Sequence, residues 1–216
     1  FFVEQIIARI FKLFANITSI LFHPLLMVTY GMILALSFTY LAIYPLSMKL
    51  VIAGGAFIST AVMPGFFILL FVKSGAAGDL ELTDRKERFV PYFIFIVSIG
   101  ACFYLMLKLM MPVWILVLLG ATAISLLIGM AINIFWKISA HLMGIGGLIG
   151  AIMGICRLHQ QNPYWAFILL FIIAGLVGTS RIFLGRHTPM QVYAGFILGF
   201  FCTFTASILS YIYLFI

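Results

Sequence analysis

The sequence predicts an all-α integral membrane protein, a single domain of six or seven transmembrane helices with an N-terminal amphipathic segment. Of its 216 residues, 65% are hydrophobic and only 8% are charged, whereas a soluble domain normally carries about 25% charged residues. The apolar residues form long runs, each close to the roughly 20 residues that a helix needs to cross a bilayer. Because a backbone in hydrocarbon must satisfy its own hydrogen bonds, these runs are predicted to be helices.

The N-terminal segment, residues 1–22, has a different pattern from the rest of the chain. It places Glu4, Arg9, Lys12 and Asn16 at roughly helical spacing among apolar residues. This spacing is typical of an amphipathic helix that lies in the membrane interface. An additional membrane span over the same residues is the alternative.

Residues 24–216 are predicted to form the transmembrane bundle of this single domain, 1–216. Its expected spans are 24–44, 48–73, 90–110, 113–135, 139–157, 163–183 and 190–216. Pro64 should kink the second span, a defect that neighbouring helices tolerate. In the fifth span, Gly147, Ala151 and Gly154 fall on one face, which predicts a close contact with another helix.

The connections between the spans alternate between short and polar ones. The short connections are 44–47, 111–112 and 158–162, and the polar ones are the loop 74–89 and the junctions 136–137 and 184–189. Two spans separate each polar connection from the next. Parity therefore places Arg88, His141 and His187 on the same side of the membrane, although they lie far apart in the sequence.

Three polar segments lie at or beside these connections. They are Arg85-Lys86-Glu87-Arg88-Phe89-Val90-Pro91, then Lys137-Ile138-Ser139-Ala140-His141, and finally Ser180-Arg181 followed by Gly185-Arg186-His187-Thr188-Pro189-Met190-Gln191-Val192-Tyr193-Ala194-Gly195. Together they resemble the three motifs of the type 2 phosphatidic acid phosphatase family, whose superfamily also includes vanadium haloperoxidases. The resemblance covers roughly residues 79–199.

The third motif of that family is Ser-Arg, five residues, His, three residues and Asp, often with Gly before the His and Pro after it. It is matched by Ser180, Arg181, Gly185, His187, Pro189 and Gly195. The second motif, usually Pro-Ser-Gly-His, is matched in part by Ser139 and His141. The first, a Lys followed by Arg-Pro, has the right residue types within 85–91 at altered spacing.

The resemblance implies a role for each matching residue. A neutral His187 would attack phosphorus and form a phosphohistidine, and His141 would act as the general acid that protonates the leaving group. Arg181 and Arg88 would clamp the phosphate oxygens, where charge builds during phosphoryl transfer and where a guanidinium fork fits. Further phosphate contacts are expected from Ser139, and Lys86 is an additional candidate. No metal or other cofactor is expected.

The third motif departs from the family at Gln191, which stands where the family places an Asp that orients the nucleophilic His. A glutamine oxygen can accept a hydrogen bond from the ring but supplies no charge. In the serine-protease triad, changing the corresponding Asp to Asn lowers turnover about 10⁴-fold. If a carboxylate does orient His187, the loop 79–87 is its expected source, because four of the chain's 5 acids lie there.

The leading function hypothesis is a membrane lipid phosphatase that hydrolyses a lipid phosphomonoester or diphosphate. Two alternatives stay open: a weakened or inactive relative that binds or translocates phosphorylated lipids, and a lipid phosphotransferase. The net charge of +7 suits anionic lipid head groups or a phosphorylated lipid, whereas nucleic acid is a poor partner for a chain that is nearly all membrane. The identity of the lipid and the oligomeric state stay open.

The remaining histidines and the cysteines are expected to have structural roles. His23 and His159 have no motif around them and should each satisfy a local hydrogen bond. Cys102, Cys156 and Cys202 lie singly within apolar runs. Their spacing indicates neither disulfides nor a metal cluster, and packing is their expected role.

The membrane is expected to be a bacterial inner (cytoplasmic) membrane, and two arguments disagree on the leaflet that the site faces. Nine basic residues fall on the motif face: Arg9, Lys12, Lys73, Arg85, Lys86, Arg88, Lys137, Arg181 and Arg186. The other face has only Lys49, Lys108 and Arg157. This bias makes the motif face cytoplasmic by the positive-inside rule. However, several of the nine are candidate phosphate ligands, and bacterial relatives in the family that it resembles commonly act on the outer leaflet.

Overall fold

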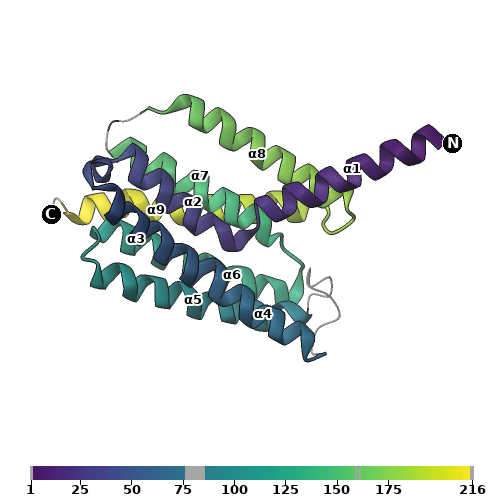
Figure 1. Cartoon of the computed structure of the whole chain (residues 1–216), viewed down its shortest axis with the longest axis horizontal. Helices are drawn as coiled ribbons and strands as arrows, with labels where there is room; N and C mark the ends of the chain where they lie inside the picture. Colours follow the sequence, from purple (N-terminus) through teal and green to yellow (C-terminus); the bar gives the residue numbers. More distant parts are fainter. Residues whose placement is uncertain (1, 76–85, 159, 161, 215–216) are drawn as a thin grey trace.

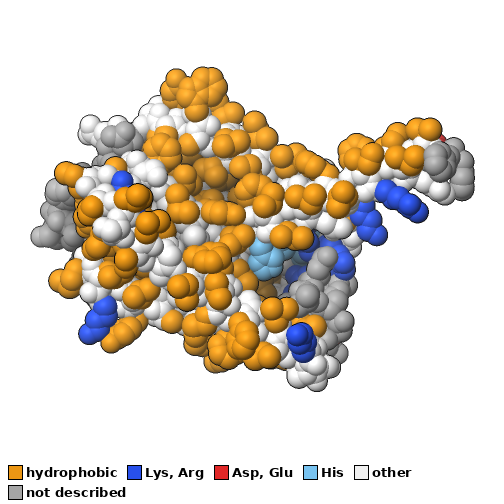
Figure 2. Space-filling view, viewed as in Figure 1, with side chains coloured by type: hydrophobic (Ala, Val, Ile, Leu, Met, Phe, Trp, Pro, Cys, Tyr) orange, Lys and Arg blue, Asp and Glu red, His pale blue; other side chains and the backbone are white. Residues whose placement is uncertain are grey.

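The computed structural model describes residues 2–75, 86–158, 160 and 162–214. Within these ranges every regular element is a helix, which confirms the predicted fold class. Six helical segments are long and apolar enough to cross a membrane: Leu46–Lys73, Phe89–Lys108, Val113–Phe135, Ala140–Arg157, Tyr164–Phe183 and Pro189–Ser210. Large apolar side chains cover the outside of the bundle (Figure 2), as expected for a surface that faces lipid.

The N-terminal helix α1 (Phe2–Leu21) projects from one end of the bundle (Figure 1). The side chains of residues 3–14 are exposed, and the C-terminal half of the helix contacts the bundle, beginning at Phe11, whose ring lies tilted with its centroid 6.2 Å from that of Phe183 in α8. The chain then turns by 59° into α2 (Pro24–Phe38). If this bent pair forms one span, the bundle has seven.

Helix α2 is shorter than the span expected over 24–44, because Thr39 ends it. The Thr39 hydroxyl donates to the carbonyl of Ala35 at 2.7 Å and accepts from the amide of Leu41 at 3.2 Å. The Thr39 side chain therefore takes the place of a backbone donor for Ala35 and of a backbone acceptor for Leu41, as threonine does at helix ends. A short 3₁₀ turn, η1 (Tyr40–Ile43), follows.

The second expected span is one continuous helical segment with an irregularity at its centre. It consists of α3 (Leu46–Phe57), a π-helical turn η2 (Ile58–Val62) and α4 (Met63–Lys73). The irregularity lies immediately before Pro64, which lacks an amide hydrogen and disturbs the regular ladder. A distortion near Pro64 was predicted, and the structure shows it as a π-helical turn.

The other spans agree with the predicted ranges to within a few residues. They are α5 (Phe89–Lys108), preceded by the 3₁₀ turn η3 (Lys86–Arg88), then α6 (Val113–Phe135), α7 (Ala140–Leu158), α8 (Tyr164–Phe183) and α9 (Pro189–Leu214). The short connections that were expected between them lie at one end of the bundle. The described residues of the polar connections lie at the other end, from which α1 projects (Figure 1).

Helices α7 and α9 run parallel and form the closest contact in the bundle. The hydroxyl of Thr203 on α9 donates to the carbonyl of Gly147 at 2.8 Å, and that of Ser207 donates to the carbonyl of Ala151 at 3.4 Å. A Cβ atom added at Gly154 would collide with Ser207. The contact that the small-residue face of α7 predicted is therefore confirmed, and its partner is α9.

Candidate active site

The residues of the three motifs converge at the end of the bundle from which α1 projects. Arg88 directly precedes α5, Ser139 directly precedes α7, and His187 lies two residues before α9, while Arg181 belongs to the last turn of α8. All four are buried: their exposed fractions are 6%, 0%, 7% and 3%, respectively. Histidine, lysine and arginine side chains gather at this end beneath α1, on a surface that is otherwise mostly apolar (Figure 2).

Two hydrogen bonds join the motif segments directly. The guanidinium of Arg88 donates through Nη1 to the carbonyl of Ile138 at 3.3 Å. The amide of Ser139 donates to the carbonyl of Gln191 at 3.3 Å. The segment before α7 is thus held between the start of α5 and the first turn of α9. The expected convergence of Arg88, Ser139 and the His187 segment is observed.

Glycines on α9 set the distance between the second and third motifs. A Cβ atom added at Gly195 would lie 2.5 Å from the carbonyl oxygen of Ser139. One added at Gly199 would collide with the carbonyl of Met143, one turn further along α7. Any side chain at these positions would push the starts of α7 and α9 apart, so the match of Gly195 to the third motif has a packing reason.

The turn that carries His187 is built on the end of α8. Gly185 adopts a φ of +67°, which a glycine tolerates because it has no Cβ atom. The carbonyl of Arg181 then accepts from the amides of Arg186 at 3.0 Å and of His187 at 3.3 Å. The backbone of Arg181 therefore positions the segment that contains His187.

The hydrogen bonds of Gln191 determine the tautomer of His187. Its Oε1 atom lies 3.0 Å from Nδ1 of His187 and accepts from the backbone amide of Thr188 at 3.2 Å. Because the amide of Thr188 can only donate, the Gln191 atom facing it is the oxygen. The same oxygen requires Nδ1 of His187 to carry the ring proton. The other ring nitrogen, Nε2, is left with its lone pair.

The surroundings of His187 keep its ring neutral. Burial lowers the pKa of His187 to about 3, and the nearby guanidinium of Arg88 contributes to this lowering. Lys137 and Arg181 act in the same direction, while the hydrogen bond to Gln191 opposes them. A ring surrounded by fixed cations disfavours a further positive charge. His187 therefore presents an uncharged imidazole to whatever occupies the site.

His141 lies on the first turn of α7 and is half-buried, and its ring contacts the junction between α1 and α2. Its Nε2 atom lies 3.2 Å from the carbonyl oxygen of Ser19, which can only accept, so Nε2 carries a proton. The ring of His23 packs edge-to-face against it, with 5.3 Å between the ring centroids. Nδ1 of His141 is therefore the ring nitrogen that could exchange a proton with a ligand.

Arg181 links these groups electrostatically. It lies within electrostatic range of His23, His141 and His187. A single buried guanidinium thus acts on three imidazoles that come from the α1–α2 junction, α7 and the α8–α9 junction. This grouping is the one that a shared anionic ligand would require.

The sequence did not single out two members of this cluster. His23 was predicted to satisfy a local hydrogen bond, and its Nδ1 atom does accept from the amide of Leu25 at 3.3 Å. The same side chain also packs against His141, which no motif indicates. Lys137 acts electrostatically on His187, and its place within the second motif was the available indication.

Several predictions fall partly or wholly outside the described residues. These are the side chain of Lys86, together with Arg85, His159 and the acids Asp79, Glu81 and Asp84 of the loop proposed to supply a carboxylate. Within the described part of the chain, no group of three or more His, Cys, Asp or Glu side chains could hold a metal ion. The ring partner that the structure does describe at Nδ1 of His187 is Gln191.

Taken together, the described groups can perform a definite set of chemical tasks. His187 can offer an unprotonated nitrogen as a nucleophile, and His141 can exchange a proton. Two buried guanidinium groups can bind oxyanions. In comparisons of the chain with models of protein families, with curated proteins and with solved structures, no match is found.

Proposed function

We propose that this chain is a membrane lipid phosphatase that works through a phosphohistidine on Nε2 of His187. The observation that carries the proposal is the pair of hydrogen bonds to Gln191 Oε1, which leaves Nε2 unprotonated beside buried cations. A neutral histidine nitrogen is the form that can attack phosphorus. The likeness of the three motifs to the type 2 phosphatidic acid phosphatase family supports the same function.

In the first step, the lone pair of Nε2 attacks phosphorus and the bond from phosphorus to the leaving oxygen breaks. His141, doubly protonated because the bound phosphate anion favours its charged form, gives the proton on Nδ1 to that oxygen while its Nε2 stays bonded to the carbonyl of Ser19, and the lipid alcohol or lipid monophosphate departs. In the second step, water attacks the phosphohistidine and passes a proton to His141. The phosphorus–nitrogen bond breaks, its electron pair returns to Nε2, and inorganic phosphate leaves with both histidines restored.

The cations around His187 would supply the electrostatic part of catalysis. Negative charge on the equatorial phosphate oxygens grows or spreads during transfer, and buried guanidinium groups stabilise it without reorganising. Arg181 and Arg88 are suited to this role because they are 3% and 6% exposed, respectively, and their backbone or side chain is already fixed by hydrogen bonds. Both would act without a metal ion.

A lipid is the proposed substrate because of where the cluster lies. The site is at the end of a bundle whose outer surface is apolar, and in a bilayer this end would lie at the depth of the lipid head groups. An amphiphile can reach such a site by lateral diffusion while its tail stays in hydrocarbon. We propose that the membrane is the inner membrane of a bacterium.

The test is phosphate release from a lipid phosphate by purified protein in detergent, with and without a divalent-metal chelator. We expect release in both cases, and an acid-labile phosphoenzyme when the lipid carries labelled phosphate. His187→Ala should abolish the phosphoenzyme and lower turnover more than about 1,000-fold. Met190→Ala is the matched control, since Met190 lies near the same junction and is 69% exposed.

Turnover in His187→Ala at the rate of the wild type would overturn the proposal. A second candidate function, binding or translocation without cleavage, is favoured by Gln191, which accepts from His187 without providing a charge. That function predicts uptake of labelled lipid phosphate and its recovery intact, with no phosphoenzyme. A phosphotransferase would form the phosphoenzyme and pass its phosphate to an alcohol.

A further inference from the structure

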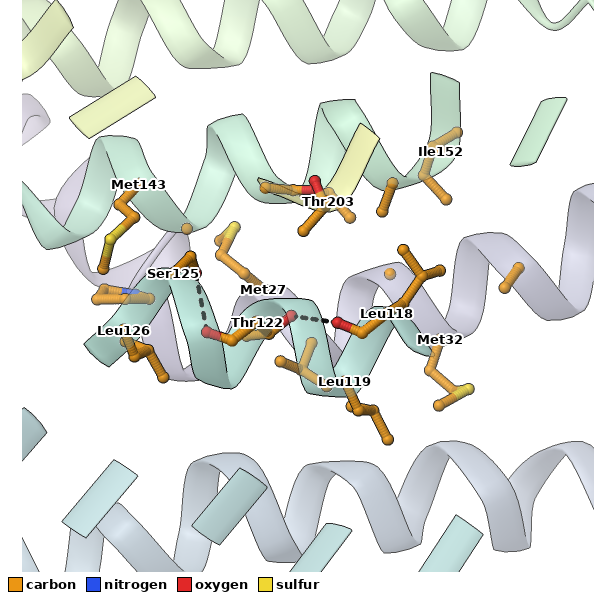
Figure 3. A pocket seen from close by; sticks show the side chains of 18 of the residues that line it. Met27, Met32, Leu118, Leu119, Thr122, Ser125, Leu126, Met143, Ile152 and Thr203 are labelled. Carbon is orange, nitrogen blue, oxygen red and sulfur yellow. Dashed lines mark hydrogen bonds between the residues drawn. The ribbon is translucent and has the colours of Figure 1, made fainter. Parts of the chain in front are cut away.

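An elongated apolar cavity runs through the bundle from the site end toward the opposite end. It has a volume of about 100 Å³ and lies between α2, α5, α6, α7 and α9. Figure 3 shows Met143, Ser125 and Leu126 at one end of it, and Ile152 and Leu118 at the other. The cavity is thus aligned with the helices and with the lipid chains of a surrounding bilayer.

The cavity begins next to the candidate active site. Pro24, which follows His23, and Ala140, which precedes His141, both line it. Its lining along α7 continues from Ala140 to Ile155. At 1.5 Å per residue this stretch is about 22 Å long, which exceeds the roughly 15 Å of one leaflet's hydrocarbon, half of a 30 Å core.

The hydroxyl groups that line the cavity already donate hydrogen bonds to backbone carbonyls of their own or a neighbouring helix. Thr122 donates to the carbonyl of Leu118 at 2.9 Å and Ser125 to that of Thr122 at 2.8 Å, as Figure 3 shows. Thr203 donates to the carbonyl of Gly147. The wall therefore presents apolar atoms to an occupant, and a polar or charged ligand would lose its hydration there without replacement.

The cavity can also widen. Met27, Met32 and Met143 line it, and methionine side chains adapt their shape at little cost because they are unbranched and flexible. A narrow apolar slot with adjustable walls fits one hydrocarbon chain better than a rigid ring system. At its volume of about 100 Å³ the cavity holds only part of a long chain, so binding the whole chain requires these methionine side chains to move apart.

We propose that this cavity binds one hydrocarbon chain of the phosphorylated lipid whose phosphate occupies the His187 site. The inference rests on the proposed function for the identity of the head group. The chain would enter past Ala140 and Met143 and lie along α7, so that the phosphate is held at the head of a tail buried inside the bundle. The enzyme would thereby select its substrate by the length and shape of the hydrocarbon chain as well as by the phosphate.

The first experiment compares butyl, octyl, dodecyl and hexadecyl phosphate as substrates of the wild type and of Thr122→Phe. The added ring would occupy the middle of the cavity. Overpacking costs of this kind correspond to about tenfold or more, so we expect kcat/KM for hexadecyl phosphate to fall by about that factor relative to butyl phosphate. Ile124→Phe is the matched control, because Ile124 lies on the same helix and is 54% exposed.

The second experiment detects the chain without turnover. Trp114 lines the far part of the cavity and is 6% exposed, whereas Trp165 is 71% exposed. A stoichiometric single-chain phosphate that carries bromine near the end of its chain should quench a variant retaining only Trp114 more strongly than one retaining only Trp165. The same brominated chain on phosphatidylcholine tests whether an ordinary bilayer lipid fills the cavity instead.

The outcomes separate the two proposals. Quenching of Trp114 by the phosphate without phosphate release would support chain binding and overturn the phosphatase. Phosphate release with no quenching of Trp114, and an unchanged chain-length profile in Thr122→Phe, would overturn the cavity proposal alone. Equal quenching by phosphatidylcholine would also overturn it, because the occupant would then be a bilayer lipid.

Discussion

A glutamine and an aspartate beside a histidine ring differ mainly in charge, because both offer an oxygen to the ring proton. Gln191 fixes the tautomer of His187 through this oxygen, which the amide of Thr188 also uses. The amide supplies no charge to stabilise an imidazolium or the positive ring of the proposed phosphohistidine. The orienting and the electrostatic functions of this position are therefore separable here.

Gln191→Glu tests the electrostatic function, because glutamate has the same length and can keep both hydrogen bonds. The carboxylate should raise the pKa of His187 and stabilise positive charge on its ring. We expect turnover of a lipid phosphate to rise about tenfold or more, measured as phosphate release at saturating substrate. Gln191→Leu, which removes the acceptor from two donors, should instead lower it.

An unchanged or lower rate in Gln191→Glu, with the protein still folded, would show that charge at this position does not limit the reaction. The folded state can be checked by size-exclusion chromatography and by the melting temperature in detergent. The comparison with Gln191→Leu then distinguishes orientation of the ring from stabilisation of its charge.

The protonation of His187 gives a prediction that needs no substrate. Burial lowers its pKa to about 3 from the ordinary value of 6.5, with Arg88 contributing. Ring nitrogen shifts in protein labelled at histidine should show a neutral His187 down to about pH 4, with the signal assigned by its loss in His187→Gln. Between the two pKa values the unfolded chain binds a proton that the folded protein does not, so this residue makes stability fall as the pH drops through that range.

A titration midpoint near 6.5 for the His187 signal would contradict the buried, cation-rich environment. At saturating phosphate the cations are compensated, and the midpoint should move upward. A midpoint that does not respond to phosphate would argue that the ligand does not reach His187.

At the level of single residues, the sequence predicted those that stand in a motif. It allowed either Gln191 or an acid of the loop 79–87 to accept from the ring of His187, and the acceptor that the structure describes is Gln191. It did not predict that His23 contacts His141, because that contact depends on the 59° turn between α1 and α2. A turn angle set by tertiary packing leaves no periodic pattern in the sequence.

At the level of elements, the pairing of α7 with α9 joins the second motif to the third. The backbones of the two helices come close together at Gly195 and Gly199, because glycine has no side chain to separate them. In a membrane, such close packing is a main source of helix association, since lipid is as apolar as the helix surface. The site geometry therefore depends on residues that make no contact with a substrate.

Gly199→Ala tests this dependence. The added methyl group would collide with the carbonyl of Met143, and we expect a loss of about 1–3 kcal/mol of stability from overpacking. Gly175→Ala in α8 is the matched control, because its added Cβ atom would meet nothing within 4 Å. The control should be neutral or slightly stabilising, since alanine favours a helix more than glycine does.

The measurement is the melting temperature of each variant in the same detergent, together with phosphate release. Equal melting temperatures for the two variants would mean that α9 can move away from α7 at no cost. If folded Gly199→Ala protein also releases less phosphate than the wild type, the added methyl group has displaced the start of α7, where Ser139 and His141 lie.

The boundaries of the helices were predictable where a long apolar run or a proline marks them in the sequence. Long apolar runs and Pro64 indicated the spans and one irregularity, and both are observed. The early end of α2 was not predicted, because it results from two hydrogen bonds of the Thr39 side chain. Threonine is common within apolar runs, so its presence alone does not indicate a helix end.

At the level of the whole molecule, an even number of spans separates the polar connections, and this brings distant motifs to one end. Parity predicted one side of the membrane for Arg88, His141 and His187, and all three lie at the same end of the bundle, where hydrogen bonds join their segments. Parity gives the relative side of each connection, but not the leaflet. The nine basic residues that the sequence assigns to the motif face, against three on the other, favour a cytoplasmic site, although several of the nine are candidate phosphate ligands.

Cysteine labelling in intact cells tests both the parity and the leaflet. In a background where Cys102, Cys156 and Cys202 are replaced by Ala, single cysteines would be placed at Ser74 or Met190 at the site end, and at Ser47 or Met110 at the opposite end. All four lie outside or at the edges of the spans and are exposed. A membrane-impermeant maleimide should label one pair and not the other.

Labelling of Met110→Cys and Ser47→Cys alone would place His187 at the cytoplasmic face, where its substrate would come from the inner leaflet. Labelling of Met190→Cys and Ser74→Cys alone would place it at the outer face, and the basic residues at that end would then be explained by phosphate binding rather than by the positive-inside rule. Labelling of one member of each pair would contradict the parity itself, because Ser74 and Met190 lie at connections four spans apart. The proposed catalysis by histidines and arginines from separate junctions requires an even number of spans between these junctions, so the same experiment tests whether the cluster can exist in the membrane.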